Sequence, residues 1–253
     1  MTDHILVEHQ GEAERRIQVI RFNRPDKKNA ITRAMYAAMA AAIAEGEADP
    51  TVRVHVLLGT PGAFTSGNDL QDFMAVAMGA AAGTEVWDFM QALATTAKPV
   101  ISGVDGIAVG IGATIQLHCD LTFATPATRF HTPFVDLGLV PEFGSSLMVP
   151  LAIGHQRAFA MLAAGVPISA GDACAAGLIY QVVEADMLEA AVLAAAEGLA
   201  AKPPEALAIA RRLIKGDPEE RLARIAEETK LFASRLKSAE AMQAFQAFMT
   251  RKK

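Results

Sequence analysis

The pattern of apolar and polar residues at the start of the chain gives two short runs rich in β-branched and apolar residues. They cover residues 5–9 and 16–22, and a polar loop that contains Gly11 separates them. This arrangement predicts a β-hairpin. Thr32 is a suitable N-cap for the helix that follows, because its hydroxyl can accept a hydrogen bond from a free amide of the first turn. The apolar face of this helix consists of Met35, Met39 and Ile43.

In the next hundred residues, strand-like runs alternate with segments that have helical spacing. The strands are predicted at residues 52–58, 100–104 and 120–124, and the helices at residues 84–96 and 111–118. This rhythm predicts a mostly parallel α/β sheet, in which ligands gather beyond the carboxyl ends of the strands. The glycine-bearing loops at 59–69 and 106–112 both follow predicted strands, so we expect them to lie side by side at that edge.

From Gly144 onward the pattern is mainly helical. Ser169 is a predicted N-cap, Gly177 is a predicted helix end, and one short strand is predicted at residues 180–183. The later helices are broken at residues 202–204 and 216–218, and their apolar stripes consist of Leu222, Ile225, Thr229, Phe232 and Leu236 and of Met242, Phe245, Phe248 and Met249. Such stripes are typical of core packing or of contacts between subunits.

Composition narrows the class of protein. Hydrophobic residues make up 52% of the 253 residues and charged residues 20%, which favours a compact globular enzyme or an oligomer. The net charge of −5 and the lack of a concentrated basic cluster argue against a nucleic-acid partner. We expect no membrane span and, because the first residues lack the pattern of a signal peptide, a cytoplasmic protein. Cys119 and Cys174 have no metal-ligand spacing, so no metal site is predicted.

The glycine-rich stretch at residues 106–114 is the first candidate for chemistry. Glycine lets a backbone approach a bound group closely, and free amides at a helix start can hold negative charge, so we expect an oxygen atom to bind here. The competing interpretation is a tight strand-to-helix turn in the core. Gly110 and Gly112 lack the third glycine of a dinucleotide site, and the chain contains neither a phosphate-binding loop nor a nucleophile elbow.

Glu142 is the second candidate, because apolar residues flank it on both sides in Val140-Pro141-Glu142-Phe143-Gly144. A carboxylate in such surroundings is desolvated, which raises its pKa and makes it a better proton acceptor near neutral pH. A glutamate after proline is also common in the first turn of a helix, where it interacts favourably with the helix dipole. Both interpretations of Glu142 stay open at this point.

Several motifs together resemble the crotonase, or enoyl-CoA hydratase/isomerase, superfamily. They lie in order along nearly the whole chain, at residues 23–30, 64–70, 106–112, 130–142 and 169–178. The resemblance implies an α/β fold built as a spiral of ββα units over residues 1–195. It also implies a helical C-terminal region over residues 196–253 that completes a homotrimer or a dimer of trimers.

The resemblance also implies which residues bind substrate. In this family two backbone amides hold the thioester oxygen of an acyl-CoA while it becomes an enolate, and the matching positions here are Asn68 and Ile111. The second donor is usually a glycine in the family. The substrate-binding residues would further include Ser66, Gly67, Asp69, Leu70 and Gly110. For Asp69, capping the next helix is the competing interpretation.

The reaction is suggested by what the chain lacks. Hydratases of the family carry two glutamates, and their positions match Thr114 and Phe134 here. Glu142 matches the single base of the Δ3,Δ2-enoyl-CoA isomerases, and the strings Ser-Gly-Asn-Asp-Leu and Phe-His-Thr-Pro-Phe look most like their peroxisomal-type branch. We therefore expect an isomerase that moves a double bond from the 3- to the 2-position. The alternatives are a 2-enoyl-CoA hydratase, in which Asp72 or Asp136 would hold water, and a non-catalytic acyl-CoA-binding protein.

The remaining expectations concern coenzyme A. It would be part of the substrate, and no separate cofactor is expected. Lys28 could contact its phosphates or ribose, although an exposed lysine in this loop could equally be solvated. Phe245 and Lys252 lie on the C-terminal helix, which in the family reaches toward the nucleotide part; core packing is the favoured interpretation of Phe245.

Overall fold

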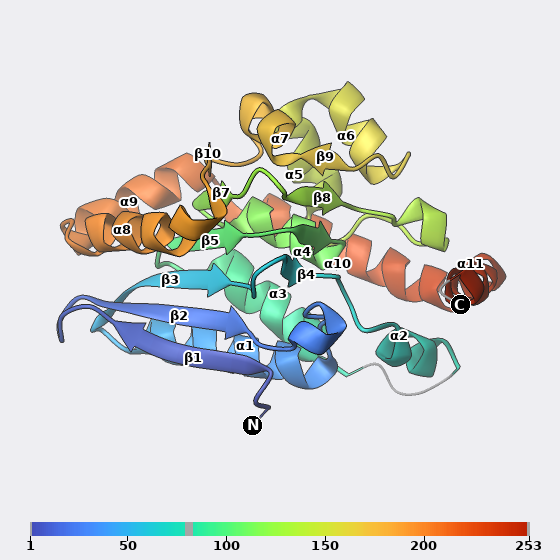
Figure 1. Ribbon diagram of the computed structural model, residues 1–253, viewed down its shortest axis with the longest axis horizontal. Helices are drawn as coiled ribbons and strands as arrows, with labels where there is room; N and C mark the ends of the chain where they lie inside the picture. The colour runs from blue at the N-terminus through green and yellow to red at the C-terminus, as the bar shows by residue number, and fades with distance from the viewer. Residues whose placement is uncertain (1, 79–82, 252–253) are drawn as a thin grey trace.

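The computed structural model describes residues 2–78 and 83–251. Successive units of the chain stack on one another in sequence order, from the N-terminal hairpin through the central strands to helices α5 (Ser145–Ile153), α6 (His155–Leu162) and α7 (Ala170–Ala176) (Figure 1). The C-terminal helices then return along the side of this stack. The arrangement is an α/β spiral with a helical C-terminal region, as the resemblance implied.

The first sheet is mostly parallel. Its strands are β1 (Ile5–Gln10), β2 (Arg16–Phe22), β3 (Val52–Leu58), β5 (Val100–Val104), β7 (Leu121–Ala124) and β10 (Gln181–Val182), in that spatial order. Only the β1–β2 hairpin is antiparallel; the other neighbours pair in parallel. The predicted hairpin and strands are therefore confirmed.

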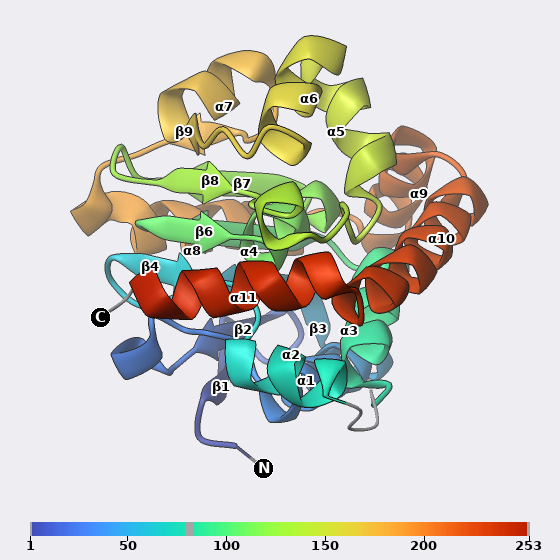
Figure 2. The same ribbon diagram turned by 90° about the vertical axis from the view of Figure 1, so that its right-hand side faces the viewer.

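A second sheet of short strands was not predicted. It contains β4 (Ala63–Thr65), β6 (Ile107–Val109), β8 (Arg129–His131) and β9 (Ile168–Ser169) in that order, which Figure 2 shows one above another. The loop predictions for residues 59–69 and 106–112 were incomplete, because each loop contains one of these strands. Strands of two or three residues have no measurable periodicity, and so the sequence pattern could not reveal them.

The two sheets create the repeating unit. Each repeat gives a strand to the first sheet, a strand to the second sheet and then helical structure: β3 with β4, β5 with β6, and β7 with β8. The helical segments that follow these pairs are α2 (Leu70–Ala77) and α3 (Glu85–Thr95), α4 (Ile111–Thr114), and the 3₁₀ turn η3 (Val135–Leu137) with α5 (Ser145–Ile153). The helix predicted at 111–118 is shorter than expected, since α4 changes to the 3₁₀ turn η2 at Ile115–His118.

Both faces of the first sheet are covered. On one face Ile20 and Leu57 pack with α3 and α1 (Arg33–Ala48), whereas on the other Val19 and Val56 pack against α8 (Leu188–Ala200). This alternation follows from the period of two in a strand, and a parallel sheet needs both faces buried. The remaining helical elements are η1 (Pro25–Lys27), α6 (His155–Leu162), α7 (Ala170–Ala176), η4 (Ala185–Met187), α9 (Pro204–Lys215), α10 (Pro218–Leu236) and α11 (Ala239–Arg251).

The predicted caps are present. The Thr32 hydroxyl accepts the amide of Met35 at the start of α1, and the Ser169 hydroxyl accepts the amide of Asp172 at the start of α7. Gly177 ends α7 in the left-handed conformation, with φ of +87°. Met35, Met39 and Ile43 are all buried on one face of α1. These short-range predictions are confirmed because capping and helical spacing are local properties.

The C-terminal helices pack on the core of their own chain. Leu222 and Phe232 of α10 contact the main hydrophobic cluster, and Ile225 is part of it. Helix α11 lies above α2 in Figure 2. Between these helices, the ring centroids of Phe245 and Phe73 are 6.4 Å apart. The favoured interpretation of Phe245 as a core residue is confirmed, because its side chain is 3% exposed.

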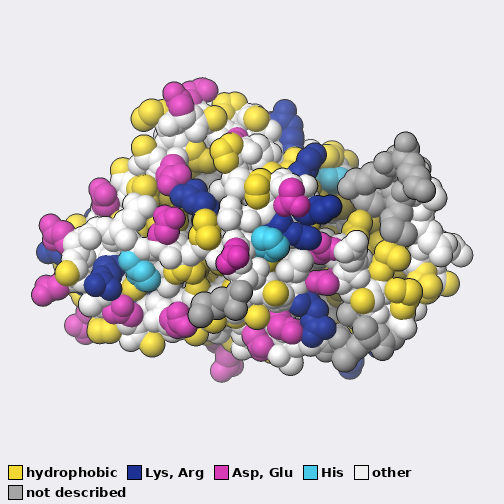
Figure 3. Space-filling view, turned by 60° about the horizontal axis from the view of Figure 1, so that its bottom comes forward, with side chains coloured by type: hydrophobic (Ala, Val, Ile, Leu, Met, Phe, Trp, Pro, Cys, Tyr) yellow, Lys and Arg dark blue, Asp and Glu magenta, His cyan; other side chains and the backbone are white. Residues whose placement is uncertain are grey.

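Within residues 2–78 and 83–251, no helix is long and apolar enough to cross a membrane. The same residues contain no cluster of three or more potential metal ligands. Acidic and basic side chains are interspersed on the face shown in Figure 3, where no continuous basic surface of the kind that binds nucleic acid is visible.

Gly106, which precedes β6, allows a close backbone contact that any larger residue at this position would disrupt. Its φ is +70°, and a Cβ atom at this position would lie 1.9 Å from the carbonyl oxygen of Gly62. Gly106→Ala should therefore lower the free energy of unfolding by about 3 kcal/mol or more. Thermal unfolding measures this loss. Gly198→Ala in α8 is the matched control, because a Cβ there meets nothing within 4 Å and should be neutral or stabilising; equal losses in both variants would contradict the assignment.

Candidate active site

The loops after β4 and β6 lie against each other, because the two strands pair in parallel. A Cβ atom on Gly67 would lie 3.0 Å from the carbonyl oxygen of Val109, and one on Gly112 would lie 2.5 Å from Cγ2 of Thr65. Glycine at both positions therefore lets the loops approach closely. The expectation that these two loops lie side by side is confirmed.

Asn68 has the one amide between Ser66 and Asp69 that has no acceptor within the described residues. The other three amides donate to the carbonyl oxygen of Lys28, the hydroxyl of Thr65 and the carbonyl oxygen of Ile31, respectively. The amides on either side of Asn68 are thus hydrogen-bonded within the chain, and the Asn68 amide is left available. Such an amide can bind an external oxygen.

The loop after β6 offers the second set of amides. Gly110 has φ of +55° and donates its own amide to the carbonyl oxygen of His131 at 2.8 Å. Ile111 and Gly112 follow as the first two residues of α4, and their amides have no acceptor among the described residues, as expected for a helix start. The side chain of Ile111 is 1% exposed and belongs to the core. The branched side chain at this position is therefore accommodated in the core.

Tyr36 supports the Asn68 loop from α1. Its buried hydroxyl donates a hydrogen bond of 2.6 Å to Oδ1 of Asn68. Burial and then the nearby Glu142 raise the pKa of Tyr36 well above its usual range, so the hydroxyl keeps its proton and remains a donor. Sequence reasoning missed Tyr36, whose position on the buried face of a helix is typical of ordinary core aromatics.

Glu142 is the buried carboxyl group of the site. Its side chain is 4% exposed, and its Oε1 accepts a hydrogen bond of 2.5 Å from the hydroxyl of Thr114 in α4. Its Oε2 has no hydrogen-bond partner within the described part of the chain. A buried polar atom without a partner is costly, and in an enzyme it is often the atom that meets substrate.

Desolvation raises the pKa of Glu142 from 4.5 to about 8. The hydrogen bond from Thr114 lowers this pKa, whereas the negative charge of Glu228 raises it. No cation pairs with Glu142 among the described residues. The carboxyl group is therefore poised to exchange a proton near neutral pH, as the apolar flanking residues suggested.

The two positions at which a hydratase of the family carries glutamate differ in their role here. Thr114 is 1% exposed and contacts Glu142 directly, whereas Phe134 is part of the hydrophobic core. The two acids considered for a water-binding role have other contacts. Asp72 accepts the amide of Arg33 at 2.9 Å, and Asp136 is exposed and lies near Gly165.

Asp69 has a structural role in the first loop. Its Oδ1 caps α2 by accepting the amide of Gln71, and its Oδ2 forms an ion pair of 2.6 Å with Arg24. Leu70 packs against the core, and the Ser66 hydroxyl donates to the carbonyl oxygen of Lys27. Contact of these three side chains with substrate stays a prediction.

The predicted coenzyme A contacts differ in their surroundings. Lys28 is exposed and has φ of +49°, and its carbonyl oxygen accepts the amide of Ser66. Phe245 is buried, as described above, and Lys252 lies outside the described residues. Lys28 is therefore the predicted contact whose side chain is available on the loop beside Ser66.

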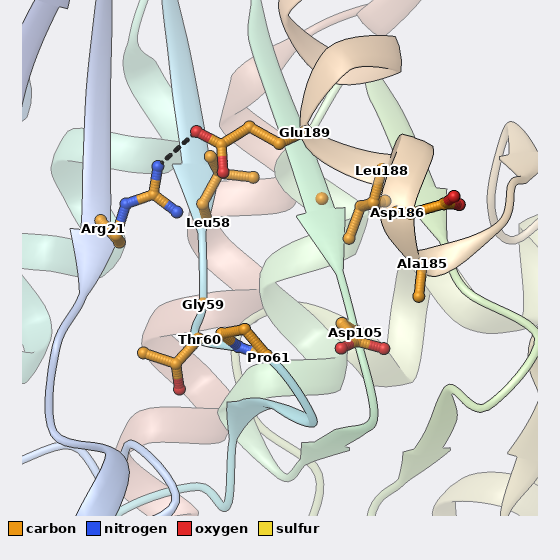
Figure 4. Close-up of a pocket in the computed structure, with 11 residues that line it drawn as sticks. Arg21, Leu58, Gly59, Thr60, Pro61, Asp105, Ala185, Asp186, Leu188 and Glu189 are labelled. Atoms are coloured by element: carbon orange, nitrogen blue, oxygen red, sulfur yellow. Dashed lines mark hydrogen bonds and ion pairs between the residues drawn. The ribbon is translucent and has the colours of Figure 1, made fainter.

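A separate hollow lies where β3 and β5 end against the start of α8, and it encloses about 320 Å³. Arg21 and Glu189 form an ion pair of 2.6 Å at its edge, and Asp105 lies on the opposite side (Figure 4). Asp105 binds the amide of Gly62 and the hydroxyl of Thr125, so it holds the loop in place. Asn68, Ile111 and Glu142 are not among the residues that line this hollow.

Comparison with known proteins identifies the family of the chain. The family model described as enoyl-CoA hydratase/isomerase matches residues 12–253. The chain belongs to this family, the crotonase superfamily. The structure of OdaA from Pseudomonas aeruginosa has 43% sequence identity and a TM-score of 0.91, with 98% of this chain and 99% of that one covered.

Among curated relatives of this crotonase, enoyl-CoA delta isomerase 2 of Rattus norvegicus is 35% identical over 254 residues, which cover 98% of this chain and 64% of the relative. Enoyl-CoA delta isomerase 3, peroxisomal, of Mus musculus is 32% identical over 93% of this chain and 76% of its own length. The chain thus spans less than two thirds of the rat relative. Other relatives are named as probable enoyl-CoA hydratases.

The raised pKa of Glu142 predicts how stability changes with pH. Because the folded-state pKa of about 8 exceeds the unfolded value of 4.5, the folded crotonase keeps a proton that the unfolded chain releases. Stability from this group is fully present below pH 4.5 and is lost as the pH rises through 8. The loss should reach up to about 5 kcal/mol, and Glu142→Gln should remove it. Thermal unfolding between pH 4 and 9, an experimental range of about five pH units, measures the effect; parallel curves for both proteins would contradict it.

Proposed function

We propose that this crotonase is an acyl-CoA isomerase that shifts the double bond of an enoyl-CoA from the 3- to the 2-position. The observation that carries the proposal is the Oε2 atom of Glu142, a buried carboxyl oxygen that lacks a partner within the described residues. Removal and return of a proton need one group whose pKa lies near the working pH, and burial gives Glu142 this property.

In the proposed reaction, the thioester oxygen binds to the amides of Asn68 and Ile111. Negative charge develops on this oxygen when Glu142 removes a proton from C2, and the two N–H groups stabilise the resulting dienolate. Glu142 then returns the proton at C4. The double bond moves without gain or loss of atoms, so neither a cofactor nor a second acid is required.

The main alternative, hydration of a 2-enoyl-CoA, needs a positioned water and usually a second carboxyl group. Glu228 is the acidic side chain whose charge acts on Glu142. Both of its oxygens already accept hydrogen bonds from Gly144 and Ser146. This arrangement favours the isomerase over the hydratase, since Glu228 has little capacity left to orient water.

Relatives that match over 93% or more of this chain, at 32–35% identity, include enoyl-CoA delta isomerases, which supports this preference. Relatives at 36% identity over 76% of this chain are named probable enoyl-CoA hydratases. Hydratase names also occur among them, so an assay must include both substrates. We further infer, from the family resemblance alone, a homotrimer or a dimer of trimers and a contact of Lys28 with coenzyme A. The acyl-chain length is left for the same assay to determine.

Glu142→Gln tests the assignment of the base. The amide cannot accept a proton but has nearly the same shape, so kcat for 3-enoyl-CoA isomerisation should fall by about 10²–10⁴-fold. Binding of acyl-CoA should stay within a few-fold of the wild type, because the oxyanion-binding amides belong to the backbone. Spectroscopic assays of 3-enoyl-CoA and 2-enoyl-CoA substrates of several lengths, with calorimetric binding as the control, measure both properties.

Two results would contradict this proposal. Retention of isomerase activity by Glu142→Gln would exclude this residue as the base. Wild-type protein that hydrates 2-enoyl-CoA but does not isomerise 3-enoyl-CoA would establish the alternative reaction instead.

A further inference from the structure

Glu228 on α10 is a buried acidic residue. It is not among the residues that the sequence predicted for the apolar stripe of this helix. Glu228 is only 4% exposed. Its carboxylate accepts hydrogen bonds from the Gly144 amide at 2.5 Å, from the Ser146 amide at 2.9 Å and from the Ser146 hydroxyl at 2.5 Å. Both carboxylate oxygens are therefore occupied by donors. Glu228 acts as the N-terminal cap of α5, because Gly144 at the N-cap position has no side chain of its own.

The segment that Glu228 holds is the turn that follows Glu142. Phe143 has φ of +58°, a left-handed conformation that is uncommon for a residue with a side chain, and Gly144 has φ of +75°. His118 holds the same turn from the other side, since its Nε2 donates to the carbonyl oxygen of Phe143 at 2.9 Å and its ring stacks on the Phe143 ring. The backbone beside Glu142 is thus kept in an unusual conformation by contacts from two other elements.

We propose that Glu228 is a positioning residue for the base: it fixes the turn after Glu142 and supplies the negative charge that Glu142 experiences. This inference rests on the proposed function for its catalytic consequence, but its structural part does not. It assigns the C-terminal helical region a role in the active site of its own chain.

The charges around Glu142 support this role. Tyr36 from α1 and His118 from η2 are buried, and desolvation keeps them neutral, since it lowers the pKa of His118 to about 3 and raises that of Tyr36. Arg224 of α10 lies farther away, where it donates to the Ser146 hydroxyl at 3.2 Å and pairs with the exposed Glu227. Glu228 is therefore the charged group that acts on Glu142 among the described residues, and it raises the pKa of Glu142.

The test compares the wild type with Glu228→Gln, each with and without Glu142→Gln. For each pair, the difference between the melting temperatures of the two proteins is measured from pH 4 to 9. The change of this difference with pH reports the ionisation of Glu142 and needs no enzyme activity. Neutral glutamine should move the midpoint of this difference down by about one pH unit, because a like charge has been removed. Glu220→Gln on the exposed side of the same helix is the matched control and should leave the midpoint unchanged.

Enzyme activity then distinguishes an effect of Glu228 on the ionisation of Glu142 from a role as a helix cap alone. In Glu228→Gln the acidic limb of the kcat profile should move down by the same amount, and kcat at its plateau should fall several-fold with KM unchanged. Glu228→Asp keeps the charge and should restore the position of the limb. An unmoved midpoint and limb in Glu228→Gln would overturn the inference and leave Glu228 as a helix cap.

If Glu228→Gln does not fold, Glu228→Asp is the second variant, because it keeps the charge on a shorter side chain. Its midpoint should stay close to that of the wild type, whereas kcat should fall several-fold because the shorter side chain holds the turn less firmly. A midpoint that moves down by about one pH unit, or an unchanged kcat, would overturn the inference. A wild type without isomerase activity but with the expected midpoint shifts would refute the proposed function and leave the role of Glu228 intact.

Discussion

The burial of the Glu142 carboxyl group without a cation is the constraint on which the site depends. Water is excluded, no ion pair neutralises the group within the described residues, and the hydroxyl of Thr114 satisfies one of its oxygens. The group therefore keeps its proton to an unusually high pH, which costs stability as the pH rises. The same desolvation that is unfavourable for folding makes Glu142 suitable for proton transfer at neutral pH.

Residues from separate parts of the chain form the site around Glu142. The spiral places the amides of Asn68 and Ile111 on adjacent loops, because β4 and β6 pair in parallel. Tyr36 holds the first loop from α1, and Glu228 holds the turn after the base from α10. Residues that never touch substrate in the proposed reaction thus determine the geometry and charge of those that do. Helix α10 of the C-terminal region thus contacts the turn beside Glu142 in its own chain.

Local signals made the first sheet, the helix caps and the breaks between the C-terminal helices predictable from sequence. Three-residue strands such as Ile107–Val109 were not predictable, because they exist only through pairing with other short strands. Glu142 was found because apolar residues flank it in sequence, whereas its contact with Thr114 is tertiary. Glu228 could have been suspected, since it lies three residues after Ile225 and four before Phe232, on the buried stripe of α10, where a charged residue requires partners.

The central claim is that one carboxyl group carries a proton from C2 to C4. The most direct measurement uses a 3-enoyl-CoA with two deuterium atoms at C2 and follows the product of a single turnover in ordinary water by mass spectrometry and NMR. Because Glu142 is buried, we predict that part of the deuterium removed from C2 appears at C4 of the 2-enoyl product. Hydrogen from solvent alone at C4 in the first turnover, at every mixing time, would contradict a single-base shuttle.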